Sequence, residues 1–430
     1  MRILNVGLGG VTREFRNWPE RIHALAMARR GHHVVAYGYH DPSNPLLKAE
    51  QEIIDGVLVR RLPRRHWPTP ELWRALEEDG PFDLVHFEHP RNVLAYGVAR
   101  WCKERGIPTI YTWLGPFHDR YLIDDREQPY DERPKYERVI YTHQQLLKRI
   151  LLDLRPSKGL KHFQPKQIAK TVLDHFRNYW LHYPLAEASA LLPCSYHEEQ
   201  ILREMGMQQP SYVVPLWIDE PYVSELAARQ STLQEELPDL ELNGPTVLYV
   251  GQLTRRKCYD LMVEAMPAVV QQHPDVTFLF VTHNPEQQAH LLALAEQRGV
   301  AKHLRFLGRL SDAALFALYR AVDVFAFPSR YEGFGLPTLE AMAAGCPLVS
   351  TDIPVINEAV QHNENGWLVR YNDAADLAAG IIRLLGDEAL RDRLIMGGYA
   401  TLRERYNEEL LASRIESIFE ELVVNHAMKA

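Results

Sequence analysis

Two carboxylates stand eight positions apart in residues 329–345, which read SRYEGFGLPTLEAMAAG. Glu332 lies in a glycine-rich turn, and Glu340 lies in a run of good helix formers for which Pro337 is a suitable first residue. Glycines let a ligand approach the backbone, and the first N–H groups of a helix are unpaired, so the stretch predicts an anion-binding seat. A carboxylate one turn into the helix suits a pair of sugar hydroxyls, and Glu332 is placed to face a reacting sugar. The alternative is a surface turn with two solvated glutamates.

The elements around this motif predict two α/β sheets. The run VDVFAFPS before it resembles a buried strand, so the motif is interpreted as strand, glycine-rich loop and helix. At the amino terminus, RILNVGL, ERIHALAMARR and HHVVAYGY read as strand, helix and strand, the opening of a doubly wound sheet. Gly9 and Gly10 fall in the first loop, at the edge where such sheets bind ligands, although a tight turn explains them equally well. A second α/β alternation begins at TVLYVGQL.

The motif SRYEGFGLPTLEAMAAGCPLVSTD resembles the donor site of the retaining glycosyltransferases of family 4, which have the GT-B architecture. The resemblance implies that Glu332 contacts the transferred sugar and that Glu340 contacts the donor ribose. It extends the donor-binding site to the residues around Glu332, namely Gly333, Phe334, Gly335 and Leu336. It further implies that Gly9 and Gly10 lie opposite the donor phosphates, and that Gly308 and Arg309, in FLGRL, border the nucleobase.

The stretch GQLTRRK resembles the basic loop of the same family, in which an arginine and a lysine stabilise the departing diphosphate in place of a metal. Gly251 and Lys257 agree with the family, whereas the usual arginine is Gln252 and the usual glycine is Cys258. Arg255 or Arg256 is therefore expected to supply the guanidinium, which binds a diphosphate through paired N–H groups. The alternative is that these bases are solvated at a helix start, where positive charge is mildly unfavourable.

The acceptor side departs from the family. Its usual histidine is Leu114 here, so His118 is a speculative substitute, and Glu88, at the end of the strand FDLVHFE, is a second candidate. The junction VVPLWID resembles the family's VIPNGVD but has Leu216 and Trp217 in place of Asn and Gly. His283 and Asn284 stand where the family more often has a glycine-rich turn, and donor contact, a core position and a surface position are all open for them.

Residues 133–170 are rich in bases although the chain carries a net charge of −8. Within them VIYTHQQLLKRILLDL has apolar residues at helical spacing. One interpretation is docking on an anionic membrane surface or a phosphorylated acceptor; the other is a solvated helical hairpin. The acidic net charge argues against nucleic acid as a partner.

Composition is that of a globular protein, with 46% hydrophobic and 24% charged residues. The four cysteines have no zinc spacing, and MRILNVGLGG lacks the apolar core of a signal peptide. A cytoplasmic protein, with or without peripheral membrane contact, is therefore expected. The predicted organisation is an acceptor domain at 1–218 with an insertion at about 119–185, a linker at 219–244, a donor domain at 245–405, and a final helix at 406–430 crossing back to the first domain.

The resemblance implies two Rossmann-like domains facing across a cleft. It implies transfer of a hexose from a nucleotide-diphosphate sugar to a glycan, glycolipid or small molecule, with the anomeric configuration retained and with no metal or other cofactor. Attack from the front face, with the leaving phosphate taking the acceptor proton, is the mechanism expected of the family. A sugar phosphorylase, a nucleotide-sugar epimerase and an inactive nucleotide-sugar-binding protein are the alternatives.

Overall fold

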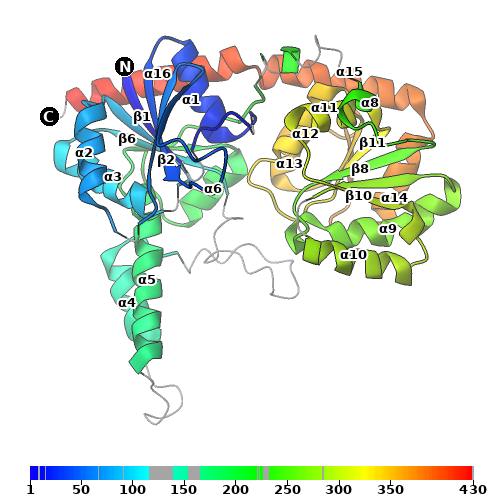
Figure 1. Cartoon of the computed structure of the whole chain (residues 1–430), viewed down its shortest axis with the longest axis horizontal. Helices are drawn as coiled ribbons and strands as arrows, with labels where there is room; N and C mark the ends of the chain where they lie inside the picture. The colour runs from blue at the N-terminus through cyan, green and yellow to red at the C-terminus, as the bar shows by residue number, and fades with distance from the viewer. Residues whose placement is uncertain are drawn as a thin grey trace.

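The computed structural model describes most of the chain, as two α/β domains lying side by side (Figure 1). Its description excludes Leu8, Gly9, Phe15, His66, Arg91, residues 116–138 and 154–164, Glu220, Tyr222, residues 226–231, His283, Asn284, Lys429 and Ala430, and the side chains of Asp153, Pro165, Gln167, Arg255, Pro285 and Glu286. The predicted sites at Gly9, His118, His283 and Asn284, and the side chain of Arg255, therefore lie outside the described residues.

The first domain has a seven-stranded sheet of order β3-β4-β2-β1-β5-β6-β7, parallel except for β3. Central strands such as β5 and β6 are buried along their whole length, as expected for a sheet covered on both faces. The short edge strand β3 is not among the predicted elements. The strands are β1 (Arg2–Gly7), β2 (His33–His40), β3 (Gln51–Ile54), β4 (Val57–Pro63), β5 (Leu84–Glu88), β6 (Thr109–Trp113) and β7 (Ala190–Pro193). The helices are α1 (Pro19–Arg29), α2 (Pro70–Asp79), α3 (Val93–Arg105), α4 (His143–Asp153), α5 (Pro165–Ala186) and α6 (Tyr196–Glu204).

The second domain has a parallel six-stranded sheet of order β10-β9-β8-β11-β12-β13. Its strands are β8 (Thr246–Val250), β9 (Thr277–Val281), β10 (Leu304–Gly308), β11 (Val324–Phe327), β12 (Leu348–Thr351) and β13 (Trp367–Val369). Its helical segments are α8 (Leu233–Glu236), η3 (Arg255–Lys257), α9 (Tyr259–Gln272), α10 (Pro285–Gln297), η4 (Ala301–His303), α11 (Asp312–Ala321), α12 (Leu336–Ala344), α13 (Pro354–Ala359), α14 (Ala374–Leu385) and α15 (Glu388–Arg405).

Strand order locates the binding edge of each sheet. Counted among the parallel strands alone, both sheets have the order 3-2-1-4-5-6 of doubly wound folds. Ligands bind such sheets outside the carboxyl ends of the strands, where the strand order reverses. In the second domain that point lies between β8 and β11, so the loops that follow these two strands, residues 251–258 and 328–335, are the expected binding loops.

The last helix, α16 (Glu408–Ala427), lies along the first domain, which confirms the predicted crossing back (Figure 1). Glu416 accepts from Arg30 Nε at 2.7 Å and lies 2.8 Å from His32 Nε2, and Phe419 packs against His86 with ring centroids 5.3 Å apart. The predicted boundaries after residues 218, 244 and 405 fall between secondary-structure elements.

Helices α4 and α5 form a hairpin that projects away from the body of the first domain (Figure 1). Among the described residues, no helix is both long enough and apolar enough to cross a bilayer.

Candidate active site

The loop after β8 is held by a buried tyrosine. The hydroxyl of Tyr249 lies 3.1 Å from the carbonyl oxygens of both Gln252 and Lys257, so it can donate to either. The loop tightens into the short turn η3, and α9 begins directly after Cys258. Gly251 opens the loop with a φ of 158°. The loop thus delivers Arg256 and Lys257 to the carboxyl edge of the sheet.

Cys258 occupies the left-handed region, with φ 52° and ψ 41°. This conformation favours glycine. That preference gives a physical reason why the similar loop of the glycosyltransferase family has glycine at this position. We expect Cys258→Gly to change the unfolding free energy by less than about 1 kcal/mol, because relief of the backbone offsets the lost burial of a small side chain. Cys258→Val should cost about 2 kcal/mol or more, since a β-branched residue is poorly accommodated there.

Thermal unfolding of the two Cys258 variants checks this expectation. Equal melting temperatures for the glycine and valine variants would contradict a backbone origin for the glycine preference.

The loop after β11 turns into α12 through Gly335, whose φ is 92°. A Cβ added there would lie 2.7 Å from Ile356 Cδ1, so both the conformation and the space call for glycine. The helix begins at Leu336, which makes Pro337 its second residue rather than the predicted first. It ends, as predicted, at Gly345, whose φ is 69°.

The two loops meet in a buried ion cluster. Lys257 Nζ donates to Glu332 Oε1 at 2.6 Å, and Arg256 NH1 lies 3.3 Å from Glu332 Oε2. Arg256 NH1 also donates to the Tyr331 carbonyl at 3.0 Å, and the Lys257 ammonium lies 4.7 Å from the centre of the Phe327 ring. The side chains of Arg256, Lys257 and Glu332 are 4%, 12% and 4% exposed.

The cluster holds two cations and one anion. Burial lowers the pKa of Lys257 to about 8, with Glu332 opposing the shift and Arg256 adding to it. Burial acts to raise the pKa of Glu332, but Lys257 and Arg256 outweigh it and hold that pKa below its ordinary value. Two neighbouring cations in a largely water-free setting favour an added anion.

Glu340 lies on α12 and faces the first domain. Asn17 Nδ2 donates to its Oε1 at 3.1 Å, and the Asn17 amide oxygen accepts from the Asp219 N–H at 3.0 Å. Burial raises the pKa of Glu340 to about 7; hydrogen bonding from Asn17 opposes the shift and the charge of Asp312 adds to it. Lys257 and Glu340 each influence the pKa of the other, so the three predicted side chains at 257, 332 and 340 share one electrostatic environment.

The remaining donor-side predictions are placed as follows. Gly10 has a φ of 72°, and its N–H donates to the carboxylate of Glu20. Gly308 ends β10 with a φ of 69°, and Arg309 after it is exposed. Gly333 and Phe334 are buried, and Phe334 packs against Tyr406 with ring centroids 6.0 Å apart. Their contacts with a donor stay a prediction.

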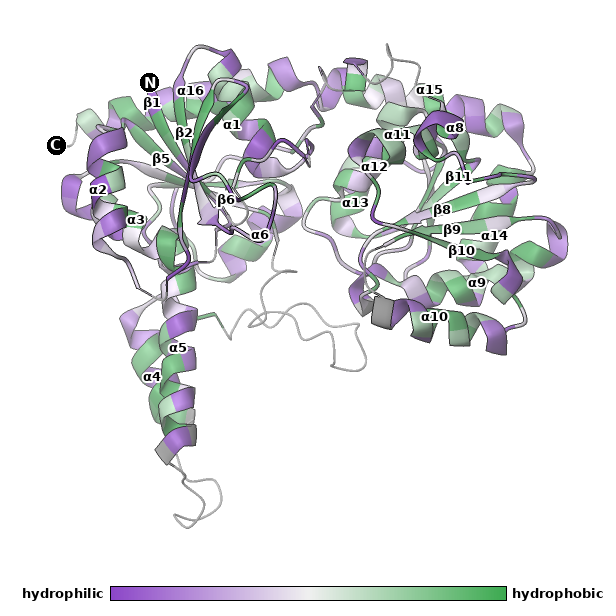
Figure 2. Cartoon of the chain, in the orientation of Figure 1, coloured by the Kyte–Doolittle hydropathy of each residue, from purple (hydrophilic) through white to green (hydrophobic). Residues whose placement is uncertain are grey.

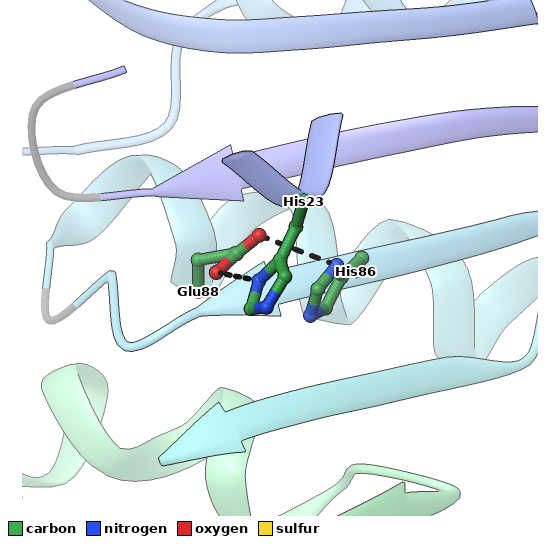
Figure 3. Close-up of side chains that lie close together, drawn as sticks. All are labelled: His23, His86 and Glu88. Carbon is green, nitrogen blue, oxygen red and sulfur yellow. Dashed lines mark hydrogen bonds and ion pairs between the residues drawn. The ribbon is translucent and has the colours of Figure 1, made fainter. Parts of the chain in front are cut away.

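Glu88, the acceptor-side candidate, is 0% exposed and lies among polar partners within the first domain (Figure 3). Asn5 Nδ2 donates to its Oε1 at 3.0 Å, His23 Nδ1 lies 2.8 Å from its Oε2, and His86 Nδ1 lies 3.4 Å from its Oε1. An acceptor-side role would require the carboxylate to leave these partners, so that role stays a prediction.

The His23, His86 and Glu88 side chains are also of the types that bind Zn²⁺, and their ligand atoms lie within 4.8 Å of one another. The nearest pair, His23 and Glu88, is at hydrogen-bond distance. The other ring nitrogen of His86, Nε2, lies 2.6 Å from Thr112 Oγ1. Burial lowers the pKa of His86 to about 4, with Glu88 opposing the shift. These contacts form a buried hydrogen-bonded network within the first domain.

A buried aspartate at the domain junction gathers three arginines. Asp219, 2% exposed, lies 2.9 Å from Arg21 NH1, 3.0 Å from Arg29 NH2 and 3.6 Å from Arg16 Nε. The Arg16 backbone N–H donates to Asp312 of the second domain at 3.0 Å. Through Arg16, Asp219 therefore anchors the loop that follows β1 next to helix α11 of the second domain.

Two family models match the chain. The model described as Glycosyltransferase Family 4 matches residues 23–220, and the model described as Glycosyl transferases group 1 matches residues 234–401. The GT-B glycosyltransferases are thus the class that the fold and the models define. The chain belongs to their family 4.

Several curated proteins are similar over part of the chain. A phosphatidyl-myo-inositol mannosyltransferase from Mycobacterium tuberculosis is 38% identical over 184 residues, 41% of this chain and 47% of the relative. A glycogen synthase from the same organism is 33% identical over 177 residues, 41% of this chain and 42% of the relative. The chain thus spans less than half the length of these relatives.

Solved structures share the fold over nearly the whole chain. Sucrose-phosphate synthase from Thermosynechococcus elongatus superposes with a TM-score of 0.69 at 19% identity, covering 99% of both chains. HepE from Anabaena, solved with UDP and glucose, superposes with a TM-score of 0.66 at 16% identity, covering 98% of this chain and 100% of its own.

Proposed function

We propose that this protein transfers a sugar from a nucleoside-diphosphate sugar to an acceptor hydroxyl, with retention at the anomeric carbon. The observation that carries the proposal is the buried cluster of Lys257, Arg256 and Glu332 at the switch point of the second sheet. Its two neighbouring cations suit a diphosphate, and the carboxylate beside them suits the sugar that the diphosphate carries. Membership of family 4 supports this function.

The proposed reaction breaks the bond between the anomeric carbon and the outer phosphate oxygen. Negative charge develops on that oxygen, and Lys257 and Arg256 stabilise it without rearrangement because they are already in place. The acceptor oxygen bonds to the anomeric carbon from the same face, and its proton passes to the departing phosphate. Glu332 orients the sugar and Glu340 binds the ribose hydroxyls. We expect no metal to be needed, because the two cations supply the charge.

Slow hydrolysis of UDP-, GDP- and ADP-sugars, followed by release of the nucleoside diphosphate, tests the proposal. We expect hydrolysis of at least one of them, with the released sugar retaining its anomeric configuration. Hydrolysis of none, with or without binding, would overturn the proposed activity and favour a binding protein. Sugar released only in the presence of inorganic phosphate would indicate a phosphorylase, and an interconverted donor sugar would indicate an epimerase.

The pKa of Lys257 predicts how nucleotide affinity depends on pH. In the free protein this pKa is about 8, and a bound diphosphate must raise it, so binding takes up a proton above that pH. The contribution of Lys257 to affinity for the preferred nucleoside diphosphate should therefore be nearly constant up to pH 7, fall about twofold by pH 8, and then fall further, approaching about tenfold per pH unit.

Calorimetric titration with UDP, GDP and ADP measures this dependence. In Lys257→Arg the alkaline fall should disappear, because a guanidinium stays charged throughout this range. An unchanged alkaline fall in the arginine variant would assign it to another group.

We also propose that the α4–α5 hairpin contacts an anionic lipid surface and brings the protein to a membrane-bound acceptor. On α4, Leu147 and Leu151 lie one turn apart and are 61% and 64% exposed. On α5, Leu173 and Phe176 are also exposed, and Figure 2 shows the apolar segments of the hairpin. Anionic lipid is the partner that fits the charge of this surface, because exposed lysines lie near these apolar side chains at positions 148, 166 and 170. The other bases of residues 133–170 include Arg133 and Lys158, which lie outside the described residues.

Sedimentation with vesicles tests the hairpin. Wild type should pellet at low salt with vesicles containing phosphatidylglycerol and stay in solution with phosphatidylcholine alone. The double variant Leu147→Gln, Leu151→Gln should stay in solution with both, whereas the control Leu410→Gln, at another exposed leucine, should behave as wild type. Self-association through the hairpin without vesicle binding would overturn the lipid proposal in favour of a second copy of the chain.

A further inference from the structure

Glu198 is a fully buried carboxyl group at the start of α6. Its N–H donates to the Ser195 hydroxyl at 3.1 Å, which caps the helix. The spacing Ser-x-x-Glu is that of a capping box, in which the glutamate returns to the helix end. Here the Glu198 side chain turns inward instead and is 0% exposed.

The partners of Glu198 come from both domains. Trp113 Nε1, at the end of β6, donates to its Oε2, and the Tyr331 hydroxyl lies 2.6 Å from its Oε1. Trp113 precedes Leu114, the position at which family 4 usually has its acceptor-side histidine. Tyr331 precedes Glu332 in the donor loop. A single carboxyl group therefore joins the end of an acceptor-domain strand to the loop that carries the sugar-facing glutamate.

Neighbouring contacts also join the first domain to the donor loop and to α13 of the second domain. Cys194 Sγ lies 3.2 Å from the Gly333 carbonyl oxygen, and the backbone N–H groups of Tyr196 and His197 each donate to the Glu358 carboxylate at 2.9 Å. The donor loop is thus held on both sides of Glu332 by residues 194–198 of the first domain.

The structure assigns to Glu198 the role of a positioning residue: through Tyr331 it fixes Glu332 relative to the acceptor side. The assignment rests on the proposed function, because the loop matters for rate only if Glu332 meets a donor sugar. Glu198 itself does not touch the reacting atoms. It acts by holding the loop to the first domain when the two domains are joined as they are here.

A neutral carboxyl group suits this position. Burial raises the pKa of Glu198 to about 8; the hydrogen bonds from Tyr331 and Trp113 oppose the shift, and Glu358 adds to it. The titratable groups that face it are Tyr331, Glu358 and Cys194, none of which supplies a positive charge. When the domains separate and the carboxyl group meets water, its pKa should return toward the ordinary value of about 4.3. Joining the domains therefore takes up a proton, and rising pH disfavours the joined arrangement between these two pKa values.

Glutamine at position 198 can reproduce both contacts, with its oxygen accepting from Trp113 and its NH₂ group donating to Tyr331. We expect Glu198→Gln to hydrolyse the preferred nucleotide sugar within about threefold of wild type at pH 7. Glu198→Ala and Tyr331→Phe should each lower kcat by about 30-fold, with nucleoside-diphosphate affinity within about threefold, and the double variant should be no slower than either single one. The ratio of the Glu198→Gln rate to the wild-type rate should rise from pH 6 to 8.

Hydrogen exchange of the amides at residues 331–335 gives a readout independent of activity. Exchange should quicken at least about tenfold in Glu198→Ala and Tyr331→Phe and stay unchanged in Glu198→Gln. Unchanged exchange in both Glu198→Ala and Tyr331→Phe would overturn the positioning role. Additive losses of kcat in the double variant would overturn it as well. If Glu198→Ala does not fold, hydrogen exchange in Tyr331→Phe, which keeps the aromatic ring, decides whether the positioning role holds. A wild type that neither binds nor hydrolyses any nucleotide sugar would overturn the proposed function, while the exchange result still decides whether Glu198 holds the loop.

Discussion

Replacing Lys257 with alanine should lower the turnover of the preferred nucleotide sugar by about 10³-fold, the largest loss of activity that we expect. Its ammonium lies 2.6 Å from Glu332, and it is one of two cations at the place where the diphosphate charge develops. Removing one preorganised charge or donor from such a site costs about 10²–10³ in kcat, and an ionic donor lies at the upper end of that range. Steady-state hydrolysis at saturating donor measures the loss.

The free energy of unfolding should change little in Lys257→Ala, because Arg256 still pairs with the Glu332 carboxylate. The matched control is Lys302→Ala, at an exposed lysine of the same domain, which should keep wild-type turnover. Turnover of Lys257→Ala within tenfold of wild type would mean that the diphosphate is stabilised elsewhere.

Asp219→Ala should destabilise the protein by about 3 kcal/mol or more, because it leaves a group of arginines without their shared counter-ion. Arg21 is the most affected, since it is 2% exposed and 2.9 Å from this carboxylate, and its other partner Asp55 is largely exposed. We expect a fall in melting temperature of at least about 3 °C in thermal unfolding.

Glu225→Gln provides the control for the junction. Glu225 lies 3.2 Å from Arg16 but is 40% exposed, so its pair should contribute less than about 1 kcal/mol. An equal loss of stability in the Asp219 and Glu225 variants would show that burial at the junction is not the cause.

Local patterns in the sequence were sufficient to predict the fold and the proximity of the two loops that carry Lys257 and Glu332. Alternating strands and helices predict two doubly wound sheets, and their strand order brings residues 251–258 and 328–335 together because both loops leave the same edge. The Lys257–Glu332 contact, between residues 75 positions apart, follows from that topology. Arg256, one of two arginines considered, is the one whose described side chain reaches Glu332.

Contacts across the domain junction could not be predicted in this way. Asn17 meets Glu340 across 323 positions and Glu198 meets Tyr331 across 133, and neither pair belongs to one sheet. The local signal at Glu198, a capping-box spacing, predicts an exposed glutamate and so favours the wrong environment. The burial of Glu88 beside Asn5 is likewise not predictable from its place at a strand end, and its acceptor-side role stays a prediction.

The measurement that tests the account most directly is the affinity gained from the second phosphate group, in wild type and in Lys257→Gln. Calorimetry would compare UDP with UMP, GDP with GMP, and ADP with AMP. For one of the three pairs we predict that wild type binds the diphosphate at least about 100-fold more tightly, and that the advantage falls below about tenfold in the variant. No advantage for any diphosphate in wild type, or the same advantage in the variant, would contradict the claim that the cluster of Lys257, Arg256 and Glu332 binds the diphosphate.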